Sequence, residues 1–138
     1  MRKLLASVLL VLVALALASA SPAIPPIPRT LANARFVYVA AYDGDQFNPN
    51  LLSEDRIAIA SVQGAIQKWG KLIVVYRPDD ADIILLVQSR PSEDVLALYD
   101  AHGSHEVYLW RMMGHGGLQP SELPLVSDFQ RAWEKISN

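Results

Sequence analysis

The sequence predicts an α+β domain in which a mixed, mostly antiparallel sheet of about five strands carries two helices on one face. Short apolar, β-branched runs separated by turn residues recur along the chain and indicate the strands. Two other segments place apolar residues at three- and four-residue intervals, which indicates helices. The predicted order is β-α-β-β-β-β-α, and packing both helices on one face is the simplest way to bury their apolar stripes.

Residues 1–20 have the three regions of a cleavable secretory signal peptide. Arg2 and Lys3 carry the positive charge, residues 4–17 are almost wholly apolar, and Ala18-Ser19-Ala20 has the small side chains that a signal peptidase requires. The apolar run is shorter than the about 20 residues of a spanning helix. We therefore expect cleavage after Ala20 and an exported product, periplasmic or secreted.

Composition narrows the classes of partner. The chain has no cysteine, so it forms no disulfide and has no lipid-bearing thiol, and we expect no membrane anchor after cleavage. Two basic residues leave with the signal peptide while all 14 acidic residues stay. No run of like charges is longer than a pair such as Asp79-Asp80. The sequence therefore lacks the clusters of Lys and Arg that are typical of nucleic-acid binders and of membrane-surface segments.

Residues 21–35 are predicted to be a proline-rich linker, and residues 36–138 a single α+β domain. The linker contains Pro22, Pro25, Pro26 and Pro28, which remove backbone donors and favour an extended, solvated chain. A proline-rich ligand for a partner is the alternative interpretation, although Arg29 is the one basic residue nearby.

The first strand and the first helix follow in order. Phe36–Tyr42 is apolar on both alternating faces, which is typical of a strand covered on both sides. Ser53 is the expected N-cap of the helix, because the acidic pair after it complements the helix dipole. Gly70 stands where a left-handed terminating residue belongs. The apolar stripe between them consists of Ile59, Val62, Ile66 and Trp69.

Four strands and a second helix complete the domain. Leu72–Tyr76 and Asp82–Ser89 are separated by a short turn around Pro78, which predicts antiparallel neighbours. Val95–Asp100 and Glu106–Met113 predict a second hairpin. Pro124 can open the last helix, in which Leu125, Phe129, Ala132 or Trp133, and Ile136 line one face.

Several short motifs resemble a known group of proteins. The segments DADIILLV (80–87), LYDA (98–101) and LWR (109–111), followed by a terminal amphipathic helix, resemble small exported bacterial proteins of unknown function. The segment DGDQFNPNLL (43–52) is similar to acidobacterial members. More distantly, the layout over roughly residues 36–136 is similar to uncharacterised envelope lipoprotein domains. The resemblance implies no activity, and the missing cysteine means that it implies no membrane tether.

The loop after the first strand is a candidate calcium site. Asp43, Asp45 and Glu54 fall at the first, third and twelfth positions of a calcium-binding loop. Phe47 and Asn48 occupy the fifth and sixth positions, where an oxygen ligand and a glycine are expected. We favour the alternative interpretation, an Asx-rich turn that leads into the helix.

The histidines are a second candidate site. His102 and His105 lie in one predicted turn and could bind zinc or transfer protons, with Asp100 or Glu106 as a further ligand or base. A straight strand of about 25 Å would carry His115 to the far end. We favour a solvated turn at this place, and we predict no cofactor.

No nucleophile has a catalytic setting, because the serines lack a GxSxG motif and cysteine is absent. Alternation places Val107, Leu109 and Arg111 on one face of their strand, and Tyr108, Trp110 and Met112 on the other. If the helices cover one face of the sheet, the other face needs a partner. We therefore expect a non-enzymatic envelope or secreted module that binds another envelope protein or itself. The alternative is a small metal-dependent hydrolase that uses the Asp43/Asp45 loop and the histidines.

Overall fold

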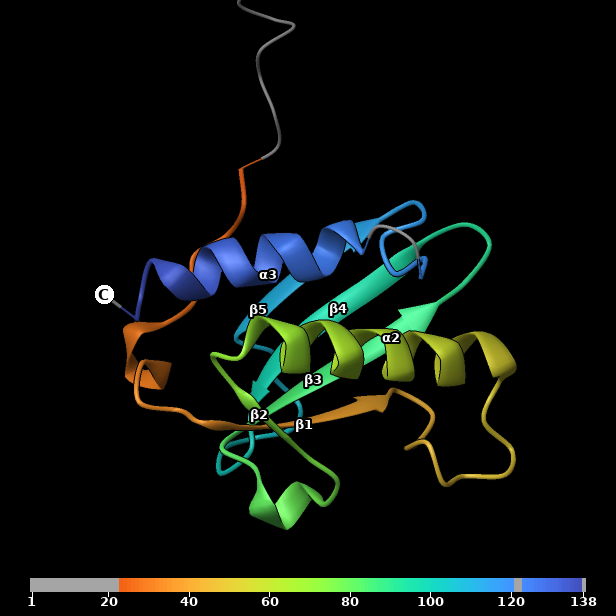
Figure 1. The fold of residues 1–138 in the computed structure, drawn as a ribbon, viewed down its shortest axis with the longest axis horizontal. Coiled ribbons are helices and arrows are strands. Elements are labelled where there is room, and N and C mark those ends of the chain that lie inside the picture. The colour runs from red at the N-terminus through yellow and green to blue at the C-terminus, as the bar shows by residue number, and fades with distance from the viewer. Residues whose placement is uncertain (1–22, 121–122, 138) are drawn as a thin grey trace, which may run out of the picture.

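The computed structural model describes residues 23–120 and 123–137 (Figure 1). The predicted signal peptide, residues 1–20, lies outside the described residues. The predicted fold class is confirmed, since a five-stranded mixed sheet carries two α-helices in the expected order. The elements are η1 (Arg29–Leu31), β1 (Phe36–Ala41), α2 (Ser53–Trp69), β2 (Ile73–Val75), η2 (Pro78–Asp80), β3 (Ile83–Ser89), β4 (Asp94–Asp100), β5 (Trp110–Gly114) and α3 (Pro124–Glu134).

The strand order is β2-β1-β3-β4-β5. β1 is parallel to both β2 and β3, whereas β3 with β4 and β4 with β5 are antiparallel. The expected hairpin between residues 95–100 and 106–113 is thus confirmed, although its second strand begins only at Trp110. Within the described ranges, no helix is long and apolar enough to cross a membrane.

The predicted hairpin between residues 72–76 and 82–89 is wrong, because β1 lies between β2 and β3. A short link can cross β1 because β2 has only three residues. Val75 at the end of β2 is in register with Tyr38, and Ile83 at the start of β3 is in register with Val37. The chain therefore steps sideways across β1 through η2 without having to return along the sheet.

The core lies between the helices and one face of the sheet (Figure 1). Ile59, Val62 and Ile66 of α2 are buried there, as the periodicity predicts. α3 contributes Phe129, whose ring lies 5.7 Å from that of Trp110 on β5 in an edge-to-face arrangement. Large aromatic rings bury much apolar area each, so this contact fixes α3 over the β5 side of the sheet.

The helix ends match the expectation from the sequence at Gly70 and Pro124 and differ from it at Ser53. Gly70 caps α2 in the left-handed conformation with a φ of 79°, and Pro124 occupies the first turn of α3. The N-cap of α2 is Leu52, so the expectation for Ser53 is wrong. Ser53 is already helical, and its hydroxyl contacts the carboxylate of Glu54, which leaves it unable to cap the turn.

The described part of the predicted linker, residues 23–35, lies against the domain and differs from a free solvated chain. Ile27 is 2% exposed and Leu31 is also buried, both within the main core. The indole Nε1 of Trp110 donates a 2.9 Å hydrogen bond to the carbonyl of Pro25. The prolines favour an extended backbone. Ile27, between Pro26 and Pro28, and Leu31, after them, hold this segment on the core.

Replacing the buried Ile27 should therefore reduce stability. We expect Ile27→Ala to lower the free energy of unfolding by about 2–4 kcal/mol, because it removes a packed aliphatic side chain. Urea denaturation followed by tryptophan fluorescence measures the loss. The exposed Thr30→Ala is the control, with an expected change within about 0.5 kcal/mol. Equal midpoints for the two variants would indicate a linker that does not pack.

Candidate functional site

The second face of the sheet, on the side away from α2 and α3, is the candidate site; we call it the open face. Strand alternation sends Val37 and Leu85 into the main core, whereas their neighbours Tyr38 and Ile84 point to the opposite side. The side chains of the open face are almost all apolar or aromatic. They are Phe36, Tyr38, Ala40, Tyr42, Ile73, Val75, Ile84, Leu86, Gln88, Val95, Ala97, Tyr99, Arg111 and Met113.

Several large apolar side chains of this face remain in contact with solvent. Ile73 on β2 is 55% exposed and lies in register with Phe36, which is also exposed. At the other edge of the sheet, Met113 on β5 is 45% exposed, and Tyr42, just after β1, is 42% exposed. Exposed apolar residues scattered singly are ordinary, but here they lie on β1, β2 and β5 around a buried cluster on the central strands, a grouping typical of an interaction surface.

The open face is hollowed in two places that share Tyr99. One hollow of about 350 Å³ is lined by Tyr42, Gln88, Tyr99, Tyr108 and Arg111; we call it the tyrosine hollow. The second, of about 260 Å³, is more apolar and is lined by Tyr38, Pro78, Ile84, Leu86, Tyr99 and His105. Tyr108 and His105 belong to the loop between β4 and β5, so this loop folds over the open face.

Burial suppresses ionisation of two tyrosines on this face. Burial and then the neighbouring carboxylate of Asp45 raise the pKa of Tyr38 to about 12, and the Tyr38 hydroxyl lies 3.2 Å from that carboxylate. Burial and then the hydrogen bond with Tyr99 raise the pKa of Tyr42 to about 12, while Arg111 acts to lower it. The hydroxyls of Tyr42 and Tyr99 are 3.4 Å apart.

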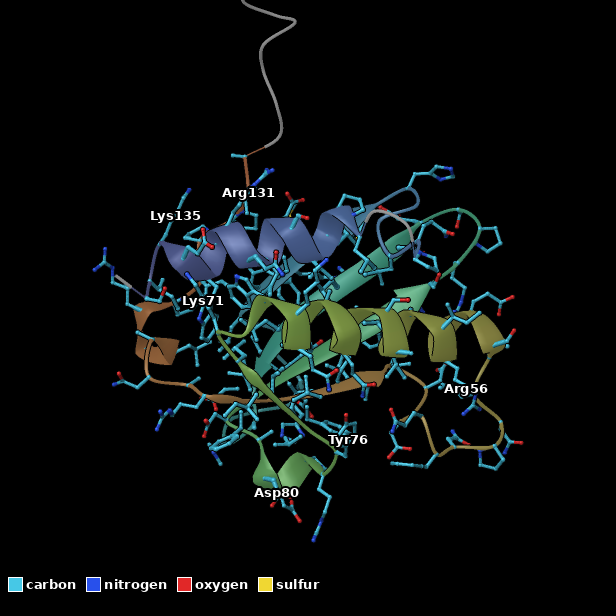
Figure 2. All side chains as sticks on the ribbon, in the orientation of Figure 1. Arg56, Lys71, Tyr76, Asp80, Arg131 and Lys135 are labelled. Carbon is cyan, nitrogen blue, oxygen red and sulfur yellow. The ribbon has the colours of Figure 1, made fainter. Side chains whose placement is uncertain are left out.

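The predicted calcium ligands have other partners in the structure. Asp43 pairs with Arg90 at 3.3 Å, and Asp45 accepts a hydrogen bond from the backbone of Phe47, which is the expected Asx turn. Arg56 reaches back from α2 and donates to the carbonyls of Gln46 and Asn48 (Figure 2). Glu54 lies in the first turn of α2. A guanidinium therefore occupies the inside of this loop.

The histidines have separate partners as well. His102 lies 3.8 Å from the carboxylate of Asp82, and His105 contacts the carbonyl of Ala101. His115, beyond β5, contacts the carbonyl of Ser92. Over residues 23–120 and 123–137, no three His, Cys, Asp or Glu side chains lie close enough to hold a metal ion. The calcium and zinc hypotheses stay predictions.

Sequence reasoning found part of the open-face cluster. Alternation placed Arg111 on the opposite face from Trp110, which is correct because Trp110 is buried in the main core. Sequence reasoning missed Tyr42 and Gln88. The alternation of FVYVAAY could have found Tyr42, since it puts Tyr38 and Tyr42 on one side. Tyr108 lies with Arg111, contrary to the predicted alternation, because residues 106–109 are not in a strand.

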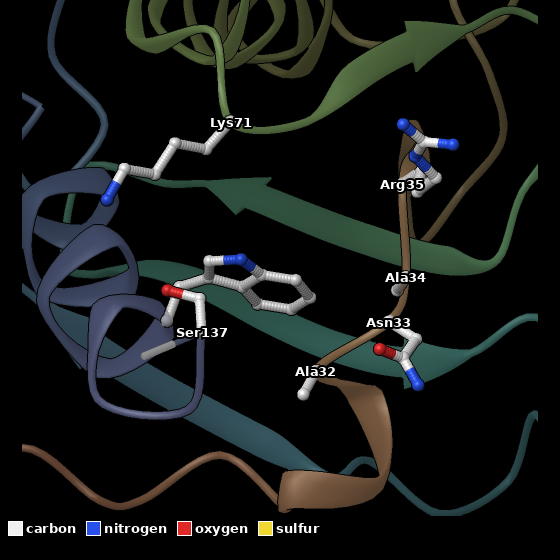
Figure 3. Close-up of a pocket in the computed structure, with 7 residues that line it drawn as sticks. Ala32, Asn33, Ala34, Arg35, Lys71 and Ser137 are labelled. Atoms are coloured by element: carbon white, nitrogen blue, oxygen red, sulfur yellow. The ribbon is translucent and has the colours of Figure 1, made fainter.

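A larger hollow lies elsewhere, between α3 and the chain before β1 (Figure 3). Its volume is about 650 Å³, and Trp133, Lys71 and Arg35 are among its lining residues. The side chain of Lys71 extends away from that of Arg35 (Figure 3). The charge of Lys71 is already paired with Glu134 at 3.6 Å. The two cations therefore do not converge on one ligand position.

No protein-family model matches the chain, and no curated protein does. Two solved structures are similar in fold. One is a PelC dodecamer from Paraburkholderia phytofirmans, with 14% identity, a TM-score of 0.44, and coverage of 81% of this chain and 95% of that one. The other is an uncharacterised lipoprotein B from Nitrosomonas europaea, with 12% identity, a TM-score of 0.34, and coverage of 86% and 87%. These are distant likenesses in overall layout; the acidobacterial resemblance stays a prediction.

A buried carboxylate holds the loop beside the candidate calcium site. Asp55 is 1% exposed and accepts hydrogen bonds from the Ser89 amide and the Arg90 guanidinium, both at 2.8 Å. We expect Asp55→Ala to lower the free energy of unfolding by about 2–4 kcal/mol, because it leaves the buried Ser89 amide without its acceptor and removes the shorter of the two ion pairs of Arg90. Thermal and urea melts followed by circular dichroism measure this. Its exposed neighbour supplies the control, Glu54→Gln, with a change within about 0.5 kcal/mol; equal losses would contradict the assigned role.

The raised tyrosine pKa values predict a loss of stability at high pH. The unfolded phenols ionise near pH 10, whereas Tyr38 and Tyr42 in the folded chain ionise at about 12. Their contribution is therefore complete below about pH 10 and is lost as the pH rises towards 12. Absorbance titration of the folded protein should show late-ionising phenols, and Tyr42→Phe should remove one of them. Ionisation of all five tyrosines together near pH 10 would contradict this.

Proposed function

We propose that the protein is an exported, non-enzymatic module that binds another protein, or a second copy of itself, through the open face of its sheet. The observation that carries the proposal is the second face of the sheet, which neither α2 nor α3 covers and on which large apolar side chains such as Ile73 and Met113 stay half exposed. Contact with water makes such a surface unfavourable, and a partner that covers it gains the hydrophobic free energy.

The composition of the face supports protein binding. Tyrosine and arginine are enriched among the residues that contribute most to protein interfaces. The tyrosine hollow brings three tyrosines together with Arg111. Tyrosine suits such a role because a large rigid ring loses little conformational entropy and has a polar tip. The adjoining apolar hollow around Ile84 and Leu86 extends the surface across the centre of the sheet.

Export is the second part of the proposal. It is supported by the charged, apolar and small-residue regions of residues 1–20. Location in the periplasm or outside the cell follows from that reading. The serines lack a GxSxG motif and the chain has no cysteine, which supports a binding role over catalysis. The positions of the Asp43/Asp45 loop and of the histidines give the hydrolase alternative no further support.

Site-specific photocrosslinking tests the binding face. A benzoylphenylalanine residue is introduced at Tyr42 or at Ile73 in the full chain, expressed in its producing cell. We expect irradiation to give an adduct of discrete mass from both positions, either twice the mass of the chain or its sum with one partner. The matched control is Ile57, which is 53% exposed on α2 away from the open face and should give none. Equal crosslinking from all three positions, or from Ile57 alone, would contradict the proposal.

A further inference from the structure

We propose that the tyrosine hollow is the site where the open face receives an acidic side chain of its protein partner, with the carboxylate bound by Arg111. The inference rests on the proposed function and adds the chemistry of the partner to it. The partner surface is largely apolar, because it must cover the exposed Met113 and the partly exposed Leu86, and it presents one aspartate or glutamate to the hollow. Four kinds of observation support this.

The first is the charge of Arg111. It makes no ion pair with any acidic residue in the described part of the chain. Its cross-strand neighbour on β4 is Ala97, which offers neither charge nor hydrogen bond. Arg111 is also the one charged side chain that lines the tyrosine hollow. An exposed cation in an otherwise neutral hollow favours an anionic ligand.

The second is the restraint on the guanidinium. Its central carbon lies 5.7 Å from the centre of the Tyr108 ring, within the range of a cation–π contact. The Tyr42 hydroxyl is close enough to hydrogen-bond to the guanidinium, and no carboxylate of the described residues pairs with its other N–H donors. A carboxylate can accept two parallel hydrogen bonds from the N–H fork of a guanidinium. Because the ring already restrains the arginine, less conformational entropy is lost on binding.

The third is the polar rim of the hollow. The hydroxyls of Tyr42 and Tyr99 lie 3.4 Å apart, and the amide of Gln88 lines the same hollow. Hydroxyl and amide groups can donate to carboxylate lone pairs that Arg111 leaves free. The tyrosine rings form partly apolar walls around the guanidinium, on which a partner side chain can pack. The volume of about 350 Å³ leaves room for an acidic side chain and part of its neighbours.

The fourth is continuity with the rest of the open face. The tyrosine hollow shares Tyr99 with the apolar hollow, and Met113 is exposed on the same strand as Arg111. A small anion would cover the guanidinium and leave the apolar surface in water. A protein surface would cover both, which is why we assign the carboxylate to a protein side chain.

Capped peptides test the hollow directly. The probes are the acetylated and amidated tripeptides Leu-Glu-Leu and Leu-Gln-Leu, which differ only in the charge of the central residue. In a nitrogen-15 NMR titration of the mature protein, we expect Leu-Glu-Leu to shift the Arg111 Nε and Tyr108 signals saturably in the millimolar range. Leu-Gln-Leu should bind at least about fivefold more weakly, which corresponds to roughly 1 kcal/mol for a partly exposed ion pair.

Matched arginine variants complete the test. Arg111→Gln should abolish the preference for the glutamate peptide, whereas Arg131→Gln should leave it unchanged. Arg131 lies on the outer side of α3 and is exposed (Figure 2). Circular dichroism melts should show that both variants remain folded, since both side chains are at the surface. Absence of any titration at tens of millimolar, equal binding of both peptides, or an unchanged preference in Arg111→Gln would each overturn the inference.

The crosslinking assay separates this inference from the proposed function. If Tyr42 and Ile73 crosslink and Arg111→Gln reduces the adduct severalfold, both hold. If the adduct forms at the wild-type level in Arg111→Gln, the open face binds a protein without the carboxylate contact, and only the further inference fails. If the glutamate peptide binds but no adduct forms at either position, the hollow exists and the proposed function fails. An adduct of twice the chain mass would identify the acidic residue as one from a second copy.

Discussion

The central strands of this protein are apolar on both faces, but residues 23–120 and 123–137 form only two α-helices, and they cover one face. Burying Val37, Leu85 and Leu96 under α2 and α3 supplies the main core, and hydrophobic burial is the largest favourable contribution to folding. The opposite face carries Ile84, Tyr99 and their neighbours. The loop between β4 and β5 covers part of this face. The interaction surface therefore follows from the same strand pattern that stabilises the domain.

The ends of the strands are held by carboxylates that accept backbone hydrogen bonds. Asp82 binds the amides of Arg35 and Phe36 at the start of β1, and Asp94, fully buried, binds those of Arg90 and Leu118. The Arg35 amide is the main cause that lowers the pKa of Asp82, with smaller contributions from Phe36 and His102, while burial opposes them. Asp55 acts in the same way at Ser89. These acids are committed to the fold, and none of them pairs with Arg111 on the open face.

Local sequence patterns predict the position of some residues of the candidate site and not of others. Alternation placed Arg111 on the opposite face from Trp110 correctly, because a strand repeats every two residues whatever surrounds it. It could not place Tyr108, whose position depends on how residues 101–109 fold back over β3 and β4. The acidic loop was expected to turn by Asx hydrogen bonds, and it does so at Asp45 and Asn48. The insertion of Arg56 into that loop comes from a helix whose position no local pattern specifies.

Patterns within short segments were sufficient to predict the fold class, the order of the elements, the end of α2 at Gly70 and the start of α3 at Pro124. Each of these depends on residues within a few positions of one another, through periodicity, capping or the fixed φ of proline. Three features depend instead on long-range packing: β1 lies between β2 and β3, Ile27 joins the core, and Tyr42, Tyr99, Tyr108 and Arg111 share one hollow. These contacts join residues far apart in the chain, and they are selected by which apolar surfaces can be buried together, a property of the whole sheet that no single segment contains.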